Sequence, residues 1–314
     1  MHLAGPAHRP HFVVNGRLSG GTGRNALRAL RERVAAAFPA AAWTPTAARG
    51  EGTALALAAA RAGAGLVVAV GGDGTVNEVV NGLMASEGRR PVLGIVPAGR
   101  GSDFARTLGL PRDPVRALEI LAGGDVRRID VAAVDCRALD PCGHGAGTRR
   151  YFVNMAGCGA SGRVVERMER WHGVGAAGYA LAAALTAFDY RWPLVELSLD
   201  GGPPATMRLN LLFVCNGQYC GGGMCVGQGA RPDDGELLVV EAVGVGRLRA
   251  MLQWPQLYFG GLQQVAGVRV RAAREVAVAG PASVLVDCDG ELCGRLPATY
   301  RIVPGALDVR VPAS

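Results

Sequence analysis

The chain has 314 residues, of which 49% are hydrophobic and 19% are charged, and its formal net charge at pH 7 is +7. This length predicts about two domains with a sizeable core. The positive charge favours an anionic partner such as a nucleotide or an acidic membrane surface. An aromatic content of 5% argues against nucleic acid as that partner. All 33 basic residues are arginine, which excludes a Walker P-loop and a Schiff-base mechanism, because both need a lysine.

Residues 1–130 alternate predicted strands with predicted helices, and polar glycine loops follow several of the strands. The alternation predicts an α/β domain with a doubly wound, mostly parallel sheet. Loops that follow parallel strands meet at the carboxyl edge of the sheet, where such folds bind ligands. In chain order, we expect strands at 11–14, 42–44, 66–70 and 92–96, and helices at about 25–38, 52–62, 76–83 and from 104 onward.

The run LVVAVGGDGTVNEVVNGL at 66–83 is the most informative segment. An apolar strand leads directly into Gly71-Gly72-Asp73-Gly74-Thr75, and the apolar residues that follow recur at helical spacing. Glycines let the backbone approach a phosphate closely, and the first N–H groups and the dipole of a helix attract it. Asp73 places a carboxylate at the same point. The segment therefore predicts a phosphate site in which a cation such as Mg²⁺ bridges Asp73 and the phosphate.

After about residue 130 the pattern changes to strand-like runs, interrupted by a helical segment at about 174–188. The runs predict a mostly antiparallel β domain. The helical segment is shorter than the about 20 apolar residues that span a bilayer, and the N-terminus lacks the apolar region of a signal peptide. We therefore expect a cytoplasmic protein with peripheral contact at the inner membrane face. The strand-like runs are 126–134, 151–156, 194–199, 207–214, 237–243, 268–273, 283–286, 299–303 and 307–311.

Two loops of the first domain carry further polar candidates. Ser19, Gly20 and Gly21 offer a phosphate cradle, although a plain loop explains them equally well. Asp103 follows the strand at 92–96 and precedes an apolar helical pattern, so we expect it to be the N-cap of that helix.

Two acidic turns stand out in the β domain. The run RPDDGE at 231–236 is either a tight turn or a hard-cation site that uses Asp234 and turn carbonyls. In the run DCDGE at 287–291, Asp289-Gly290 predicts a hairpin turn. That turn does not explain Glu291, whose carboxylate could accept the proton of an attacking hydroxyl in a phosphoryl transfer.

Together these motifs resemble the bacterial soluble lipid kinases of the diacylglycerol kinase catalytic-domain family, which are relatives of sphingosine and ceramide kinases. The resemblance covers nearly the whole chain, and the motifs occur in the order of the family. They are GGDGTVNEVVNGL (71–83), GIVPAGRGSDFARTLGLP (94–111), RRIDVAAVD (127–135), YFVNMAGCGASGRVV (151–165), GGGMCVGQGARPDDGELLVVEA (221–242) and DCDGELCGRLPATYRIVPGALDVRVP (287–312).

The resemblance implies an N-terminal α/β nucleotide domain at 1–130, rejoined by 300–314, and a β-sandwich domain at 131–299, with the active cleft between them. It implies that Asp73 organises the catalytic Mg²⁺ and that Glu291 is the general base. The carbonyls of Arg231 and Glu236, with the carboxylate of Asp234, would hold a structural Mg²⁺. Asp103 and Asp130 would belong to an internal acidic network. ATP would be held by Asn15, Ser19, Gly20, Gly21, Thr46, Gly71, Gly72, Asp73, Gly74, Thr75, Asn77, Glu78, Gly99 and Arg100.

The chain departs from the family pattern in two loops. Asn15-Gly16 stands where the family usually has Asn-Pro, with an extra residue before Ser19. Arg100 replaces a hydroxyl residue that contacts the nucleotide, and Ser102 replaces an amide. Arginine can pair with phosphate in a bidentate manner, or it can narrow the pocket, so the preference for ATP is less firmly implied than the fold.

The leading interpretation is an ATP- and Mg²⁺-dependent kinase that phosphorylates a hydroxyl of diacylglycerol or a related lipid. One alternative is a NAD kinase, which shares the GGDG motif. Another is a non-catalytic lipid or nucleotide sensor, suggested by Arg100 and Ser102. We expect a lipid substrate and no nucleic-acid partner. The sequence leaves open which lipid is used and whether the protein forms a homodimer.

Overall fold

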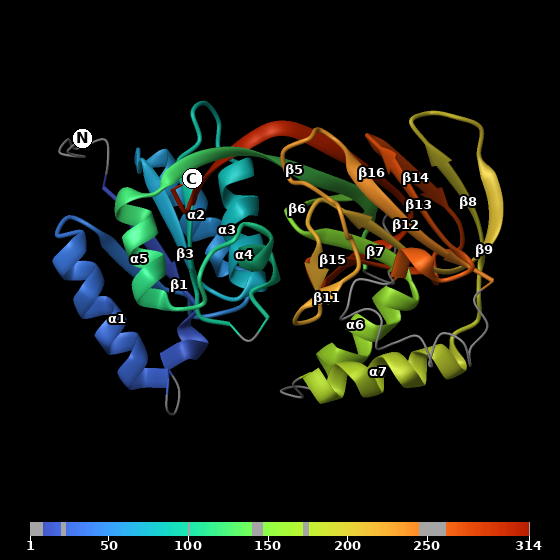
Figure 1. The fold of residues 1–314 in the computed structure, drawn as a ribbon, viewed down its shortest axis with the longest axis horizontal. Helices are drawn as coiled ribbons and strands as arrows, with labels where there is room; N and C mark the ends of the chain where they lie inside the picture. The colour runs from blue at the N-terminus through green and yellow to red at the C-terminus, as the bar shows by residue number, and fades with distance from the viewer. Residues whose placement is uncertain are drawn as a thin grey trace. The chain divides into compact units, whose positions relative to one another are not determined.

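The computed structural model describes residues 9–19, 23–99, 101–139, 147–171, 176–244 and 262–313 (Figure 1). The chain divides into two compact units. The first contains Met1–Ile129 and Gly305–Ser314, and the second contains Asp130–Pro304. Two strands, β5 (Asp125–Arg137) and β16 (Glu291–Val311), run from one unit into the other. The first unit is therefore built from two separate stretches of sequence.

The first unit is organised around a parallel sheet. β1 (His11–Val14) lies between β2 (Ala42–Pro45) and β3 (Leu66–Gly71), and β4 (Val92–Pro97) follows β3. The end of β16 pairs with β4 in the same direction, with Val309 opposite Leu93. Every residue of β3 is buried, as expected for a β-branched run in the middle of a parallel sheet.

Helices pack in pairs in this unit: α2 lies against α3, and α1 against α5. Gly82 allows the close approach of α2 and α3, because a Cβ there would lie 2.4 Å from the carbonyl oxygen of Thr53. The α/β class predicted from the sequence is confirmed, and the doubly wound arrangement stays a prediction. The helices are α1 (Gly23–Ala37), α2 (Glu51–Arg61), α3 (Asp73–Met84), α4 (Asp103–Thr107) and α5 (Pro114–Gly123).

The second unit is rich in antiparallel strands, as predicted. The strands β9, β7, β15, β16, β14 and β8 pair in this order, and β8 pairs with β9 again, so they form a closed circuit. On another side of β9, the sheet continues through β12 to β13. Strand β6 pairs with β5. The strands are β6 (Gly147–Phe152), β7 (Met155–Gly159), β8 (Leu194–Leu199), β9 (Ala205–Cys215), β10 (Tyr219–Cys220), β11 (Met224–Cys225), β12 (Leu237–Val243), β13 (Val268–Ala273), β14 (Glu275–Ala279) and β15 (Leu285–Cys288).

The core of this unit contains Phe152, Leu212 and Tyr300, all essentially inaccessible to solvent. Two helices, α6 (Ala160–Arg170) and α7 (Ala176–Asp189), pack against each other, and α6 also contacts β7, β9 and β15. Within the described ranges, no helix combines the length and hydropathy that a membrane crossing needs.

Two predictions for strands were wrong in detail. The run at 151–156 belongs to two strands, β6 and β7, which are separated at 153–154. The runs at 299–303 and 307–311 belong to one strand, β16, which continues through Pro304 and through Gly305, where the backbone is left-handed with φ 56°. Helix α6 was not predicted, because its amphipathic pattern begins directly after the glycine-rich strand β7.

Candidate active site

The glycine turn after β3 brings two loops of the first unit into contact. Gly72 is the extended residue before α3, with φ −96° and ψ −169°. A Cβ added to Gly99, after β4, would lie 2.4 Å from the Cα of Gly72, so a side chain there would collide with the backbone. The Ala98 N–H also donates to the Gly71 carbonyl at 2.9 Å. The two loops therefore form a backbone surface at the carboxyl edge of the sheet.

Asp73, the first residue of α3, lies beside this surface. Its Oδ1 accepts a hydrogen bond from the Phe104 N–H at 3.1 Å. A Cβ on Gly101 would lie 3.0 Å from Oδ2 of Asp73 and 3.5 Å from Oδ2 of Asp103. The two carboxylates thus approach the same point next to Gly101, which makes an oxygen-rich environment of the kind that suits a hard cation.

The prediction that Asp103 caps α4 was wrong by one residue. The N-cap is Ser102, whose backbone is left-handed with φ 52° and whose side chain makes no cap hydrogen bond, and Asp103 is the first residue of the helix. A left-handed conformation at a residue other than glycine is strained, and such strain gathers at functional loops. This conformation turns the chain so that Asp103 begins the helix beside Asp73.

Asn15, Gly16 and Thr46 meet at the ends of β1 and β2. The Asn15 N–H donates to the Val70 carbonyl at 2.9 Å, and the Gly16 N–H donates to Oγ1 of Thr46 at 3.2 Å. A Cβ on Gly16 would lie 2.0 Å from the Thr46 carbonyl oxygen, which explains why this chain has glycine at that position. Ser19 ends a short 3₁₀ helix, Gly16–Ser19, while Gly20, Gly21 and Arg100 lie outside the described residues.

Glu78 and Asn77 are buried within the first unit. The two carboxylate oxygens of Glu78 accept hydrogen bonds from the backbone N–H groups of Gly50, at 2.7 Å, and Gly52, at 2.9 Å, at the start of α2. Asn77 has no exposed surface. In the same helix, Thr75 packs its Oγ1 against Gly71, where a Cβ would lie 2.3 Å away. Glu78 therefore holds α3 against the start of α2, and Thr75 packs α3 against the end of β3.

The run 287–291 in the second unit forms the predicted hairpin between β15 and β16. Asp289 and Gly290 have φ of 46° and 82°, as a tight two-residue hairpin turn requires, and Cys288 pairs with Glu291. The Asp289 carboxylate accepts hydrogen bonds from three backbone N–H groups, those of Val153 and Asn154 at 3.1 Å and of Met155 at 3.0 Å. Asp289 therefore fixes the turn to the junction of β6 and β7.

Glu291, the candidate base, follows this turn. Its Oε2 lies 2.9 Å from Nη2 of Arg150 on β6, and the side chains of Arg150 and Glu291 are 31% and 15% exposed. The ion pair orients the carboxylate while leaving part of it accessible. Arg150 was not identified from the sequence, because its neighbour is distant in the chain and no local pattern marks it.

A buried acid lies just before the turn. Asp287 is buried in the second unit, and Ser161, near the start of α6, donates a hydrogen bond to its Oδ1 at 2.7 Å. Burial raises the pKa of Asp287 to about 6. The hydroxyl bond opposes this effect but does not outweigh it. Neither Asp287 nor Ser161 was singled out from the sequence.

The run 231–236 forms a turn with hydrogen bonds of its own. Oδ1 of Asp234 accepts from the Glu236 N–H at 3.1 Å, and Oδ2 of Asp130 accepts from the Gly235 N–H at 2.7 Å. Arg231 lies 3.4 Å from Asp233. In the part of the chain that the structure describes, no group of three or more His, Cys, Asp or Glu side chains is placed to hold a metal. The turn explanation accounts for these contacts, and the metal role of Arg231, Asp234 and Glu236 stays a prediction.

Comparison with known proteins gives a consistent result. A model of the diacylglycerol kinase catalytic domain matches residues 9–134, and a model of the YegS C-terminal NAD kinase beta sandwich-like domain matches residues 154–311. A YegS-like lipid kinase of Chromohalobacter salexigens is 38% identical over 182 residues, which cover 55% of this chain and only about half, 53%, of that protein.

Two further comparisons extend over most of the chain. A diacylglycerol kinase of Mycobacterium tuberculosis is 31% identical over 251 residues, or 78% of this chain and 76% of that protein. A crystal structure assigned to a diacylglycerol kinase of Bacillus anthracis is similar with a TM-score of 0.77 at 25% identity, and the match covers 97% of both chains.

Proposed function

The chain belongs to the family of diacylglycerol kinases and YegS-like lipid kinases, which are phosphotransferases, and from this premise we propose that it transfers the γ-phosphoryl group of ATP to a hydroxyl of diacylglycerol or a related lipid. The observation that carries the proposal is the close approach of Gly72 and Gly99 beside the Asp73 carboxylate. Such an arrangement offers backbone to a phosphate and oxygen ligands to its counter-ion.

The nucleotide would bind at the carboxyl edge of the parallel sheet. Gly72, Asp73, Gly74 and Thr75 lie where the N–H groups at the start of α3 attract phosphate. Asn15 and Thr46 come together at the neighbouring strand ends. We retain Ser19, Gly20, Gly21, Gly71, Gly99 and Arg100 in this proposed site. Asn77 and Glu78 would act indirectly, since their side chains are buried and Glu78 binds the start of α2.

The residues around Asp73 fit Mg²⁺. Oδ1 of Asp73 is held by the Phe104 N–H, while the Oδ2 atoms of Asp73 and Asp103 both approach Gly101. Carboxylate oxygens are the donors that Mg²⁺ prefers. When bound, the ion would supply charge neutralisation to the phosphates. Asp73 would hold it, and the Phe104 N–H would fix the orientation of the carboxylate.

Glu291 would accept the proton of the lipid hydroxyl while the hydroxyl oxygen forms a bond to the γ-phosphorus, the bond from that phosphorus to the bridging oxygen breaks, and ADP leaves. Arg150 positions the carboxylate through the ion pair, and Asp289 fixes the turn that carries it. The other oxygens of the transferred group would be stabilised by backbone N–H groups at the start of α3. Most of the rate enhancement in such a reaction comes from positioning and electrostatic stabilisation.

The test is transfer of labelled phosphate from ATP to a panel of diacylglycerol, monoacylglycerol, sphingoid bases and polyprenols, with identification of the product. Glu291→Gln should lower turnover by roughly 10²–10⁴-fold, as expected for loss of a general base, and should leave ATP affinity unchanged. Turnover at the wild-type level in this variant would show that the base assignment is wrong.

The same assay distinguishes the alternatives. Formation of NADP from NAD without lipid phosphorylation would favour a NAD kinase. ATP binding without transfer to any lipid would favour a sensor. We also propose peripheral contact with a membrane, because the expected substrate resides there, and we keep a second Mg²⁺ at Asp234 and a homodimer as proposals. Equilibrium dialysis with Asp234→Ala and light scattering test the last two.

A further inference from the structure

Helix α7 has an unusual distribution of side chains. Ala182, Ala183 and Thr186 are buried, whereas Leu181, Leu185 and Phe188 are 55%, 43% and 71% exposed. Residues 181, 185 and 188 are spaced so that they lie on one side of a helix. The bulky apolar residues therefore point to solvent and the small residues point to the protein, which is the reverse of an ordinary surface helix.

A further exposed apolar residue follows the helix six positions after Phe188. Leu194, the first residue of β8, is 57% exposed and pairs with Arg208 of β9. Across the described residues, five large hydrophobic side chains are strongly exposed, and four of them are Leu181, Leu185, Phe188 and Leu194. The fifth, Val126, lies in the other unit. The strongly exposed apolar residues are thus concentrated in one short segment of the second unit, and such a concentration is typical of an interaction surface.

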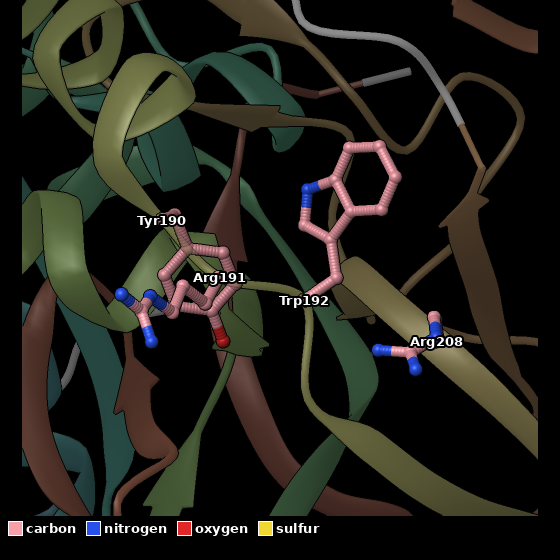
Figure 2. Close-up of a pocket in the computed structure, with 4 residues that line it drawn as sticks. All are labelled: Tyr190, Arg191, Trp192 and Arg208. Carbon is pink, nitrogen blue, oxygen red and sulfur yellow. The ribbon is translucent and has the colours of Figure 1, made fainter.

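Positive charge lies next to this apolar surface. A cavity of about 480 Å³ is lined by Tyr190, Arg191, Trp192 and Arg208, and in the view of Figure 2 Tyr190 and Arg191 lie on one side with Trp192 and Arg208 on the other. Arg191 and Arg208 are exposed, and neither forms an ion pair with any residue that the structure describes. Their charges are available to an anion.

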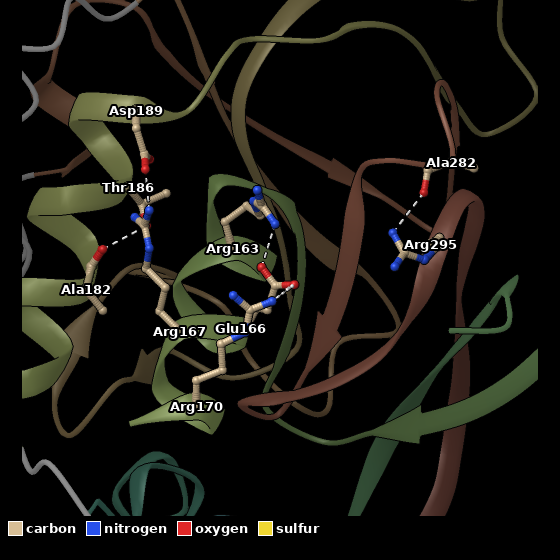
Figure 3. A network of polar contacts seen from close by, with 9 residues as sticks. All are labelled: Arg163, Glu166, Arg167, Arg170, Ala182, Thr186, Asp189, Ala282 and Arg295. Carbon is tan, nitrogen blue, oxygen red and sulfur yellow. Dashed lines mark hydrogen bonds and ion pairs between the residues drawn. The ribbon is translucent and has the colours of Figure 1, made fainter. Parts of the chain in front are cut away.

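Two acidic residues of α6 and α7, Glu166 and Asp189, are already paired with other arginines. Figure 3 shows Arg167 between Asp189, with which it forms an ion pair, and Thr186, whose Oγ1 accepts a hydrogen bond at 2.6 Å. In the same view Glu166 lies between Arg163, at 2.5 Å, and Arg170, at 3.2 Å. Glu196, two residues beyond Leu194 on β8, is exposed and limits the surface on that side.

We propose that Leu181, Leu185, Phe188 and Leu194, together with Arg191 and Arg208, form a docking surface for a bilayer leaflet that contains anionic phospholipid. This α7 surface would insert its apolar side chains at the boundary between head groups and acyl chains, while the two guanidinium groups bind lipid phosphates. Trp192 has the amphipathic character typical of that boundary. The unpaired arginines favour a lipid leaflet over an uncharged protein partner.

The inference rests on the proposed function, because a kinase for a membrane lipid needs to hold the surface that contains its substrate. It adds the place of contact and the class of lipid that is recognised. Its test uses the full chain without nucleotide, so that it does not depend on turnover. The probes are vesicles of phosphatidylcholine alone and vesicles in which a third of the lipid is phosphatidylglycerol, and binding is measured by sedimentation.

Two double variants separate the apolar and charged contributions. Leu185→Ser with Phe188→Ser should weaken binding to the anionic vesicles by roughly tenfold or more, because buried apolar area is lost. Arg191→Ala with Arg208→Ala should also weaken it by roughly tenfold or more, since each arginine near an anionic surface contributes, and high salt should abolish the difference between this variant and the wild type.

Matched controls lie in the first unit. Val126→Ser removes an apolar side chain that is 47% exposed, and Arg61→Ala removes an exposed arginine of α2. Both controls should bind vesicles like the wild type. All substitutions are at exposed positions, and thermal unfolding should confirm that each variant is folded. Wild-type binding by the α7 variants, or equal loss in the controls, would overturn the proposal. The proposal would also be overturned if the wild type were a dimer and the α7 substitutions made it a monomer, because the surface would then be an interface between copies of the chain.

Turnover on substrate dispersed in neutral detergent micelles separates this inference from the proposed function. The α7 variants should phosphorylate micellar substrate at the wild-type rate but vesicle substrate more slowly. If the wild type phosphorylates no lipid in either form, the proposed function fails, and the sedimentation result still decides the docking surface. If turnover occurs and the variants match the wild type on vesicles, the docking surface is refuted and the kinase proposal remains.

Discussion

Asp73-Gly74 and Asp289-Gly290 are two of the Asp-Gly pairs in this chain, and they place the aspartate in different environments. In the first unit, Oδ1 of Asp73 accepts one backbone N–H, and Oδ2 faces Gly101 together with Asp103. In the second unit, the Asp289 carboxylate accepts three backbone N–H groups, and the neighbouring Glu291 carboxylate is held by Arg150.

The difference shows that an Asp-Gly pair does not define a role by itself. A carboxylate that accepts three backbone N–H groups is a structural element, because its main hydrogen-bonding directions are occupied. A carboxylate with one such bond beside another carboxylate suits a cation. On this basis we assign ion binding to Asp73 and turn support to Asp289. Substitutions at the two positions should therefore affect different properties.

The largest effect is expected for Asp73→Asn. The amide oxygen can still accept from the Phe104 N–H, so the unfolding temperature should stay near the wild-type value. Loss of the negative charge should lower turnover by about 10³-fold, as for removal of a key electrostatic group, and should weaken nucleotide binding in the presence of Mg²⁺. Parallel kinase assays and thermal unfolding would check this, and a large loss of stability with normal turnover would reverse the assignment.

Asp289→Ala should show the opposite pattern, with a decrease of about 4 kcal/mol in the free energy of unfolding, since charge-assisted hydrogen bonds to three N–H groups are lost. The left-handed backbone, with φ 46°, also suits alanine less well than aspartate. Denaturant unfolding measures the change. Asp289→Asn is the matched control and should lose less, because its amide oxygen can replace the oxygen that accepts two of the bonds.

The smallest predicted effect is a change in stability caused by Asp287, and this change depends on pH. Its pKa in the folded protein, about 6, is raised by burial from 3.8. The folded state therefore favours the protonated, neutral carboxyl group of Asp287. The stabilisation of the folded state that results is complete below pH 4 and is lost as the pH rises to 6. A shift of about two units corresponds to about 2–3 kcal/mol.

Asp287→Asn cannot ionise, so this variant should not lose stability as the pH rises. From pH 4 to pH 7 the unfolding temperature of the wild type should therefore fall relative to that of the variant. Asp135→Asn is the control. The hydrogen bond from Arg149 lowers the pKa of Asp135, so its own titration lies below this window. A flat difference for Asp287→Asn between pH 4 and pH 7 would contradict the explanation by burial.

The sequence predicted those parts of the fold in which local pattern and burial agree. Leu66–Val70 is apolar throughout and is fully buried as a central strand, and the glycine turn and helix after it lie where the pattern indicates. The Asp289-Gly290 hairpin was predicted for the same reason. Helix α5 was missed, although Asp113 caps it and Pro114 opens it, because these two residues also fit a turn.

The parts of the site that could not be predicted depend on distant contacts. Arg150 and Glu291 are 141 positions apart, and Ser161 and Asp287 are 126 apart. Glu78 was expected to contact a nucleotide, but its carboxylate binds backbone groups 26 and 28 positions away. No local periodicity carries such information. The metal, nucleotide and base assignments themselves stay predictions until the experiments above are done.

The return of β16 to β4 has a consequence for biosynthesis. Val309 pairs with Leu93, and Arg310 donates a hydrogen bond to the Gly124 carbonyl. The N-terminal unit therefore lacks its outer strand until the ribosome has passed the whole intervening β region. Co-translational folding should leave the edge of β4 uncovered during that interval, and nascent chains arrested before residue 305 should be cleaved more readily by protease than released chains.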